Sequence, residues 1–439
     1  MKLKDLETRA AALMDEAVQQ GADQAEVVAS HRTVSRITFE KNDFQLASTN
    51  TMLTLGLEVH KDGRKGSAVT NETEPGQLGD AAGKALTLAS FSIPDEHLCF
   101  AGPQEPEELP GRYDPELAEL PADELRGFAE RFLEAGRHPK LSLDGADMEL
   151  ASGQRVVVNS QGLAVRDRRT RLEWSLMGMG KTEDEVTSFD WVSDGSFAWK
   201  GAPERSLDTA RGLQDKVLAC FGPRKGTSYK GRVLLSPAVV GELLLHPLEF
   251  HISGRQIMDG KSRWEKQLGE SVASEIFTLV DDPFDLGLDG AKPFDAEGVA
   301  TRPTPIIEKG LLKAHIDSTY TARRRGTEST GHAGGLHACR IEPGGSKLAD
   351  LRAMADPLVV VERFSGNLDP VTGDFSGVAK NSHWYEGGER RHPLTETMIA
   401  GNFFEMLKDI VALGDEAVNY SSSYRSPWIL VDGISVTAG

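Results

Sequence analysis

The sequence predicts an α+β protein with two domains: an N-terminal domain of helices packed on an antiparallel sheet, and a C-terminal, mostly antiparallel β domain with few helices. Two observations lead to this prediction. The first half combines helical apolar spacing with runs of alternating apolar and polar residues, whereas the second half is rich in glycine and short strands. Gly222-Pro223 separates the two patterns, so we expect domains at residues 1–222 and 223–439.

The first domain is expected to open with a helix, because Leu6, Ala10 and Leu13 recur at helical spacing and Gly21 ends the run. Turns are expected at Asn42-Asp43, Ser152-Gly153 and elsewhere. Prolines recur among acidic residues in an irregular connector at 93–121. The expected helices lie at 3–20, 76–90, 122–136 and 203–221, and the expected strands at 27–41, 42–50, 51–60, 142–151, 154–159 and 164–179.

The second domain is expected to begin with a strand at 232–235 and then a helix, because Ser236 and Pro237 form an N-cap and first-turn pair. Glu308-Lys309-Gly310 predicts a hairpin turn, and residues 327–335 predict a flexible polar loop. The other expected elements are a helix at 402–411 and strands at 272–280, 294–302, 305–307, 311–317, 357–363 and 427–436.

The composition is typical of a globular protein, with 39% hydrophobic and 26% charged residues. No apolar run approaches the roughly 18 residues needed to cross a bilayer, so we expect no membrane partner. The segment MKLKDLETRAAALMDEA follows an amphipathic helical pattern with acidic residues throughout, unlike a secretory signal. We therefore expect a cytoplasmic protein.

The formal net charge of −18 disfavours nucleic acid as a partner. The basic run Arg323-Arg324-Arg325 is too short to reverse this and predicts a solvated turn or a partner contact. Cys99, Cys220 and Cys339 lie far apart and are odd in number, which argues against a disulfide framework and a thiolate-rich zinc site. We expect each to be a small buried hydrophobe.

Two short patterns resemble ligand-binding loops. The segment GMGKT at 178–182 matches the end of a phosphate-binding loop, but Ser175 replaces the opening glycine and the carboxylates of 183–185 follow. We interpret it as a strand end with a turn. The segment Asp369 to Asp374 predicts a turn, since a calcium loop needs a denser, alternating pattern of oxygen ligands.

The segment His246-Pro247-Leu248-Glu249-Phe250-His251 lies in an apolar helical run and is the main candidate for chemistry. Zinc hydrolases place two imidazoles on one short segment with a glutamate beside the first, because that carboxylate takes a proton from metal-bound water. Here Pro247 follows His246. Glu249 lies two positions further on, about 200° around a regular helix, so it does not replace the lost base. Pro247 also disturbs the helix that would aim both imidazoles at one metal.

This segment is followed in order by STYTARRRGTESTGHAGG, PLVVVERFSGNLDPVTGDFSG, ETMIAGNFFEMLKDIVALGD and SPWILVDGISVTAG. Over nearly its whole length the chain thereby resembles the TldD/PmbA family, also called modulators of DNA gyrase. The resemblance implies that TldD-type members carry an HExxxH zinc segment and a C-terminal cysteine ligand. It also implies that PmbA-type (TldE) members lack a working version and pair with a TldD-type chain.

His246 and His251 fall on the two histidines of the TldD pattern, and Pro247 falls where its glutamate stands. No cysteine follows Cys339. The chain thus offers only two of the four groups that a catalytic zinc site of this pattern uses. We expect no catalytic residue, no metal ligand and no cofactor in this chain, and zinc in the TldD-type partner.

The expected function is that of a PmbA/TldE-like, catalytically inactive subunit of a heterodimeric zinc metallopeptidase that trims peptides and unfolded or unstructured segments. The expected partners are a TldD-type chain and such a substrate, and a homodimer of the isolated chain stays open. Two alternatives are kept. One is an independent metal-dependent hydrolase using His246, His251 and an oxygen ligand such as Asp259 or Glu249. The other is a regulatory, non-enzymatic binder of a gyrase inhibitor or toxin peptide.

Overall fold

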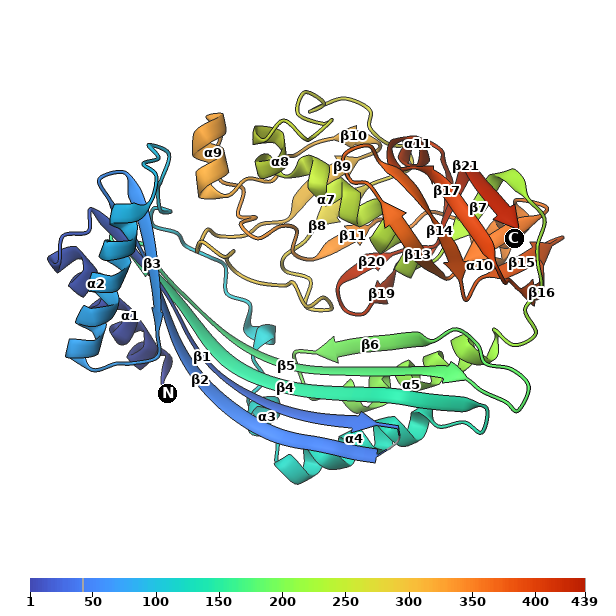
Figure 1. Cartoon of the computed structure of the whole chain (residues 1–439), viewed down its shortest axis with the longest axis horizontal. Helices are drawn as coiled ribbons and strands as arrows, with labels where there is room; N and C mark the ends of the chain where they lie inside the picture. Colours follow the sequence, from blue (N-terminus) through green and yellow to red (C-terminus); the bar gives the residue numbers. More distant parts are fainter. Residues whose placement is uncertain (42, 439) are drawn as a thin grey trace.

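The computed structural model describes residues 1–41 and 43–438, and it confirms the α+β class. Its scaffold is a six-stranded antiparallel sheet in the N-terminal half, and a six-stranded and a nine-stranded sheet in the C-terminal half. Figure 1 shows the long curved strands of the first sheet along one side of the molecule and the C-terminal sheets with their helices along the other. The division after residue 222 falls between α5 and β7 and stays a prediction.

The N-terminal sheet has the strand order β3-β2-β1-β4-β5-β6. Its strands are β1 (Gln24–Glu40), β2 (Asp43–Lys61), β3 (Arg64–Thr70), β4 (Leu141–Asn159), β5 (Ala164–Gly180) and β6 (Asp190–Ser196). Helices α1 (Leu3–Gln19) and α2 (Pro75–Phe91) share one apolar core with the sheet. Helices α4 (Ala122–Gly136) and α5 (Ala202–Leu218) share another. The connector holds only the short helices η1 (Pro110–Arg112) and α3 (Pro115–Ala118).

Two predicted strand breaks are wrong. Strand β4 continues through the expected turn at Ser152-Gly153, where Gly153 pairs with Arg32 on one side and Arg169 on the other. Strand β2 likewise continues through residue 50. Strand β4 lies between the long strands β1 and β5, and β2 pairs with β1 along nearly its whole length, so these ladders of hydrogen bonds override the local turn preference. Of the turn expected at Asn42-Asp43, Asn42 lies outside the described residues.

The C-terminal half contains the sheets β10-β9-β8-β11-β20-β19 and β13-β14-β17-β21-β7-β12-β15-β16, with β18 paired to β21. Its strands are β7 (Tyr229–Leu235), β8 (Leu279–Asp281), β9 (Thr304–Glu308), β10 (Leu311–Leu312), β11 (Cys339–Ile341), β12 (Leu358–Val361), β13 (Arg363–Leu368), β14 (Asp374–Lys380), β15 (His383–Glu386), β16 (Glu389–Pro393), β17 (Thr397–Asn402), β18 (Ile410–Leu413), β19 (Val418–Tyr420), β20 (Tyr424–Ser426) and β21 (Ile429–Ala438). Its helices are α6 (Pro237–Val240), the π-helical turn η2 (Gly241–Leu245), α7 (His246–Ile252), α8 (Gly254–Met258), α9 (Thr319–Arg325), α10 (Leu348–Ala353) and α11 (Phe403–Lys408). Among the strand pairs of the described residues, only β7–β12 and β11–β20 are parallel, so this half is mostly antiparallel, as predicted.

Three strands predicted here, at 272–280, 294–302 and 311–317, are short or absent, and the helices α8, α9 and α10 and several strands, among them β14–β17, were not predicted. Of residues 272–280 only the last two are in β8, and residues 294–302 form a loop with one isolated bridge. The carboxylate of Asp295 accepts the backbone N–H groups of Glu297 and Val299, so local bonds replace a sheet ladder there. Helix α9 was not predicted; Ser318 caps its start, and Gly326 ends it at a φ of +70°. The GMGKT segment ends β5 and turns back through a bridge from Lys181, which confirms the interpretation of a strand end.

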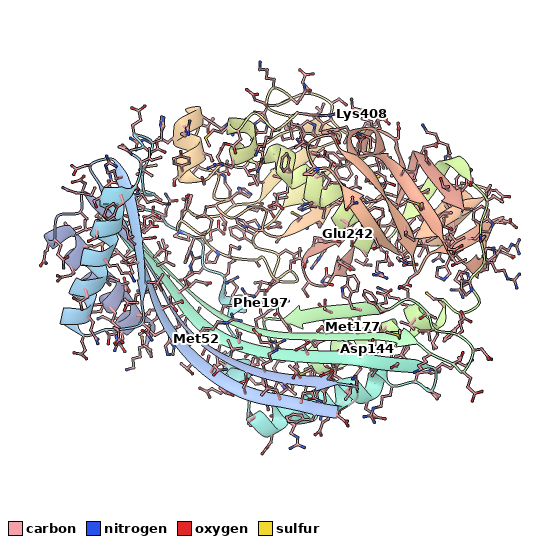
Figure 2. All side chains as sticks on the ribbon, viewed as in Figure 1. Met52, Asp144, Met177, Phe197, Glu242 and Lys408 are labelled. Atoms are coloured by element: carbon pink, nitrogen blue, oxygen red, sulfur yellow. The ribbon has the colours of Figure 1, made fainter. Side chains whose placement is uncertain are left out.

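The two halves meet around a buried aromatic ring. Figure 2 shows Phe197 between the N-terminal sheet and the C-terminal half. The guanidinium groups of Arg112, Arg169 and Arg171 lie 5.5, 5.5 and 5.1 Å from the centre of that ring. Arg169 and Arg171 also form ion pairs with Asp289 of the C-terminal half. The ion pairs with Asp289 therefore join the halves, whereas the contacts with Phe197 lie within the N-terminal half.

All three cysteines are free; Cys220 and Cys339 are buried, and Cys99 is half-buried. Among the helices of the described residues, none combines the length and apolarity needed to cross a membrane.

Candidate functional site around helix α7

The helix that carries the histidine segment is interrupted directly before it. After α6 the backbone widens into the π-helical turn η2, in which the N–H of His246 donates to the carbonyl of Gly241, five residues back. Pro247 lacks an N–H and its ring crowds the preceding turn, which accounts for the wider turn at this place. The proline thus changes the course of this helix.

His251 lies on the buried side of α7 among aromatic rings. Its ring centre is 5.7 Å from that of Trp264, 6.1 Å from that of Phe403 and 4.8 Å from that of Phe404. The backbone N–H of Arg263 donates to its Nδ1 at 3.2 Å, whereas its buried Nε2 has no hydrogen-bond partner. Burial lowers the pKa of His251 to about 4. His251 is therefore a neutral imidazole of the core at neutral pH.

His246 lies on the other side of α7, where its exposed ring lines a cavity of about 520 Å³ together with Glu249. His251 does not line this cavity. The two histidines that match the TldD pattern therefore do not converge on one metal position, and they do not fit a zinc ion between them. Asp259, the other proposed oxygen ligand, is exposed and forms an ion pair with Arg255 at 3.2 Å.

Glu249 is held at the cavity wall by the segment that passes over it. The N–H of Leu336 donates to Glu249 Oε1 at 3.0 Å. Burial raises the pKa of Glu249. A Cβ atom on Gly335 would lie 2.1 Å from the same oxygen, and Gly335 has a φ of +103°. Only glycine suits both the close approach and this backbone conformation.

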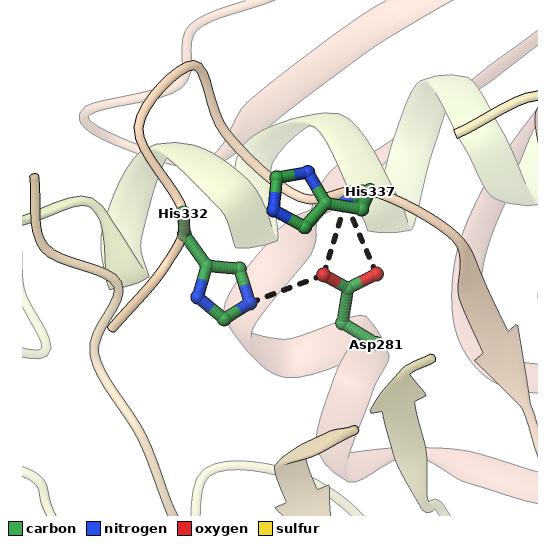
Figure 3. A group of neighbouring side chains, drawn as sticks. All are labelled: Asp281, His332 and His337. Carbon is green, nitrogen blue, oxygen red and sulfur yellow. Dashed lines mark hydrogen bonds and ion pairs between the residues drawn. The ribbon is translucent and has the colours of Figure 1, made fainter. Parts of the chain in front are cut away.

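Behind the cavity, three buried residues from two segments meet (Figure 3). Asp281 ends β8, His332 lies in the loop that follows α9, and His337 lies just before β11. Each offers one ligand atom, and these atoms lie within 4.8 Å of one another. His332 Nε2 is 3.1 Å from Asp281 Oδ2, and the two imidazole rings are stacked with centres 5.0 Å apart. His332 also lines the cavity.

Strand pairing brings these residues together. In the antiparallel pair β8–β11, Asp281 lies opposite Cys339. The Asp281 carboxylate accepts the N–H of His337 at 3.0 Å and that of Ala338 at 2.6 Å. Burial alone would raise the pKa of Asp281, but the neighbouring His332 and His337 side chains and the backbone donors outweigh burial and lower it. Burial lowers the pKa of His337 to about 4.

Two aspartates, Asp317 and Asp295, hold the loop that carries His332. Thr330 donates its N–H to the backbone carbonyl of Asp317, and the Asp317 carboxylate pairs with Arg325 at 2.5 Å. The Asp295 carboxylate accepts the N–H of Ala333 at 2.9 Å. The segment expected as a flexible polar loop is therefore partly buried, and Asp281, His332 and His337 were not predicted as site residues.

Cys339 does not add a thiolate to this group. Its Sγ lies 3.8 Å from Asp281 Oδ1, and burial raises its pKa well above the usual thiol range. Two residues of the basic run at the end of α9 make contacts within the chain: Arg325 pairs with Asp317, and Arg324 donates to the hydroxyl of Tyr320.

Comparisons with known proteins agree on one family. The model of the PmbA/TldA metallopeptidase C-terminal domain matches residues 228–438, and that of the PmbA/TldA metallopeptidase domain 1 matches residues 25–89. The Metalloprotease PmbA homolog of Haemophilus influenzae is 27% identical over 394 residues, covering 87% of this chain and 85% of that protein. Metalloprotease PmbA of Escherichia coli O157:H7 is 28% identical over 406 residues, covering 90% and 88%.

The fold is also found in a solved structure. The crystal structure of TldE from Thermococcus kodakarensis matches with a TM-score of 0.87 and 24% identity, covering 98% of this chain and 100% of that chain. The sequence relatives, the family models and the fold together show that this chain belongs to the TldD/PmbA family of metallopeptidases.

Proposed function

We propose that this chain is the PmbA/TldE-type, catalytically inactive subunit of a heterodimeric metallopeptidase whose TldD-type partner carries the zinc and the general base. The environment of α7 carries the proposal. Pro247 stands where the base would be, His246 is exposed, and His251 is enclosed by Trp264, Phe403 and Phe404. Half a ligand set on opposite sides of a helix does not hold a catalytic zinc.

The same environment argues against an independent hydrolase built on His246 and His251. That alternative needs His251 Nε2 to reach a metal together with His246, yet His251 lies in the core and does not line the cavity. Asp259 is engaged with Arg255. The remaining alternative, a binder of a gyrase inhibitor or toxin peptide, has no specific support in this geometry.

The proposed substrates are peptides and unstructured segments of proteins. The cavity beside α7 supports this role, because it is large enough to receive a side chain or a chain end, at about 520 Å³. The edge strands β3 and β6 of the N-terminal sheet offer unpaired backbone groups for an added strand. The net charge of −18 disfavours acidic peptides.

Co-expression with a TldD-type chain that has an intact HExxxH segment tests the pairing. A tag on this chain is expected to retain both chains, in equal amounts, through affinity and size-exclusion chromatography. Alone, the chain is expected to elute as a monomer or homodimer. Failure to retain the TldD-type chain, with no effect on its cleavage of peptides, would refute the proposed function.

A further inference from the structure

We propose that Asp281, His332 and His337 bind a first-row divalent cation of the zinc class, at a site separate from His246 and His251. The site goes beyond the proposed function, since it needs neither a partner chain nor catalysis by this one. Three features of the group carry the inference: the fixed orientation of both imidazoles, an unsatisfied buried nitrogen, and the access that the cavity provides.

Backbone carbonyls fix which nitrogen of each imidazole is free. His332 Nδ1 lies 2.9 Å from the carbonyl of Thr330, and His337 Nε2 lies 2.7 Å from that of Gly331. A carbonyl oxygen only accepts, so each of these nitrogens carries the proton and donates it. The free lone pairs are then on His332 Nε2 and His337 Nδ1. Histidines that bind metals usually have this arrangement, with the second nitrogen held by a carbonyl or carboxylate.

The free nitrogen of His332 faces a carboxylate without a proton between them. The His332 side chain is 1% exposed and that of Asp281 is 0% exposed. His332 Nε2 lies 3.1 Å from Asp281 Oδ2, yet it lacks a hydrogen-bond partner of acceptable geometry. A lone pair that faces a buried carboxylate oxygen is unfavourable unless a cation lies between them. A divalent ion would satisfy both atoms.

The donor set selects the class of ion. Two imidazole nitrogens and one carboxylate suit zinc and its first-row neighbours, whereas magnesium and calcium prefer oxygen ligands alone. Bonds of about 2.0–2.1 Å in a tetrahedral site place ligand atoms roughly 3.3 Å apart, close to the distance between His332 and Asp281. The third ligand atom lies within 4.8 Å of the others, so all three are near enough to share one ion once they draw together around it.

The cavity gives the ion a route and an open position. His332, Gly334 and Gly335 form part of the cavity wall, and Glu249 faces the same space. A cation can therefore approach the group from the side of His332, which lines this cavity and faces Asp281. A fourth ligand, a water molecule or a carboxylate of a bound molecule, can approach from this side.

Metal titration of the purified, chelator-treated chain tests the site. Calorimetry with zinc chloride and visible absorption with cobalt chloride are expected to show one equivalent of metal and a cobalt spectrum typical of nitrogen and oxygen ligands. Asp281→Asn and His332→Gln are expected to weaken binding by at least about 100-fold, beyond the usual effect of removing an outer-shell partner. His246→Ala, which removes an exposed ring from the same cavity, is the matched control and is expected to bind as the wild type does.

Several outcomes would overturn the proposal: no stoichiometric binding by the wild type, binding that survives in both variants, or binding lost in His246→Ala. The last would move the site to α7. A proton shared by His332 and Asp281 in place of a metal would give the first outcome. X-ray absorption of the cobalt-loaded wild type identifies the ligand atoms directly, and so the test does not require that any variant folds. Its spectrum is expected to contain two imidazole ligands, and a spectrum without imidazole would contradict the site.

Discussion

Replacing His251 with phenylalanine tests whether this residue is a core imidazole or a metal ligand. The ring is fully buried among three aromatic side chains, so a phenylalanine keeps most of the packing. It removes the acceptor for the N–H of Arg263, which costs about 1 kcal/mol. It also removes the buried Nε2 that has no partner, which offsets part of this cost. At pH 7 we expect the free energy of unfolding to change by no more than about 1 kcal/mol.

The diagnostic effect appears in acid. Burial lowers the pKa of His251 in the folded chain from 6.5 to about 4, so between these values only the unfolded chain takes up the proton. The stabilising contribution is therefore present above pH 6.5 and is lost as the pH falls towards 4. At 1.36 kcal/mol per pKa unit the whole effect is about 3 kcal/mol, of which about 2 kcal/mol is lost by pH 5. The His251→Phe variant has no imidazole at this position, so its free energy of unfolding does not include this loss.

Urea denaturation at pH 7 and pH 5, followed by circular dichroism with a chelator present, measures the effect. The wild type is expected to lose about 2 kcal/mol more than His251→Phe between the two pH values. His246→Phe is the control for introducing a phenylalanine into this helix. Equal losses in the wild type and His251→Phe, or a stability that rises with zinc only when His251 is intact, would refute the assignment of His251 to the core.

Three further predictions follow from buried groups and close contacts. Burial, with smaller contributions from Glu58 and Glu297, raises the pKa of Glu26 in the folded chain to about 7. The contribution of protonated Glu26 to the free energy of unfolding is therefore complete below pH 4.5 and is lost as the pH rises through 7. Glu26→Gln is expected to exceed the wild type in stability at pH 8 by up to about 3 kcal/mol, and an advantage over the wild type that is no larger at pH 8 than at pH 5 contradicts this. In thermal unfolding, Gly335→Ala is expected to lose about 2 kcal/mol more stability than Gly334→Ala. Both glycines have a positive φ, but only a Cβ at Gly335 would lie 2.1 Å from Glu249 Oε1. Equal losses in the two variants would show that the loop moves aside without cost. Pro247→Glu recreates an HExxxH segment but is expected to cleave no peptide in zinc, and activity in this single variant would show that His251 can leave the core.

Elements whose pattern is local could be predicted from the sequence. Helix α1 follows from the spacing of Leu6, Ala10 and Leu13, all of which are buried as expected. Helix α4 likewise has the predicted bounds. The unbroken course of β4 could not be predicted, because Gly153 is a turn residue by composition and is held in a strand only by pairing with β1 and β5.

In the candidate site, too, some features could be predicted from the sequence and others arise only in the fold. Pro247 was recognised from the sequence as a defect in a metal-binding segment, because one residue decides it. The enclosure of His251 depends on Trp264 and Phe403, which are distant in sequence and meet it only in the fold. The group of Asp281, His332 and His337 depends on the register of β8 with β11. Two histidines five positions apart around Gly334-Gly335 were the available signal, but the polar composition of that segment favoured a solvated loop.

Peptide cleavage by separated and recombined chains tests the central claim most directly. This chain, a TldD-type chain with an intact HExxxH segment, and an equimolar mixture are each incubated with zinc and an unstructured peptide. We predict no cleavage by this chain alone, and cleavage by the mixture that exceeds that of the TldD-type chain alone and is not abolished by His246→Ala. Cleavage by this chain alone that is abolished by His246→Ala would contradict the claim.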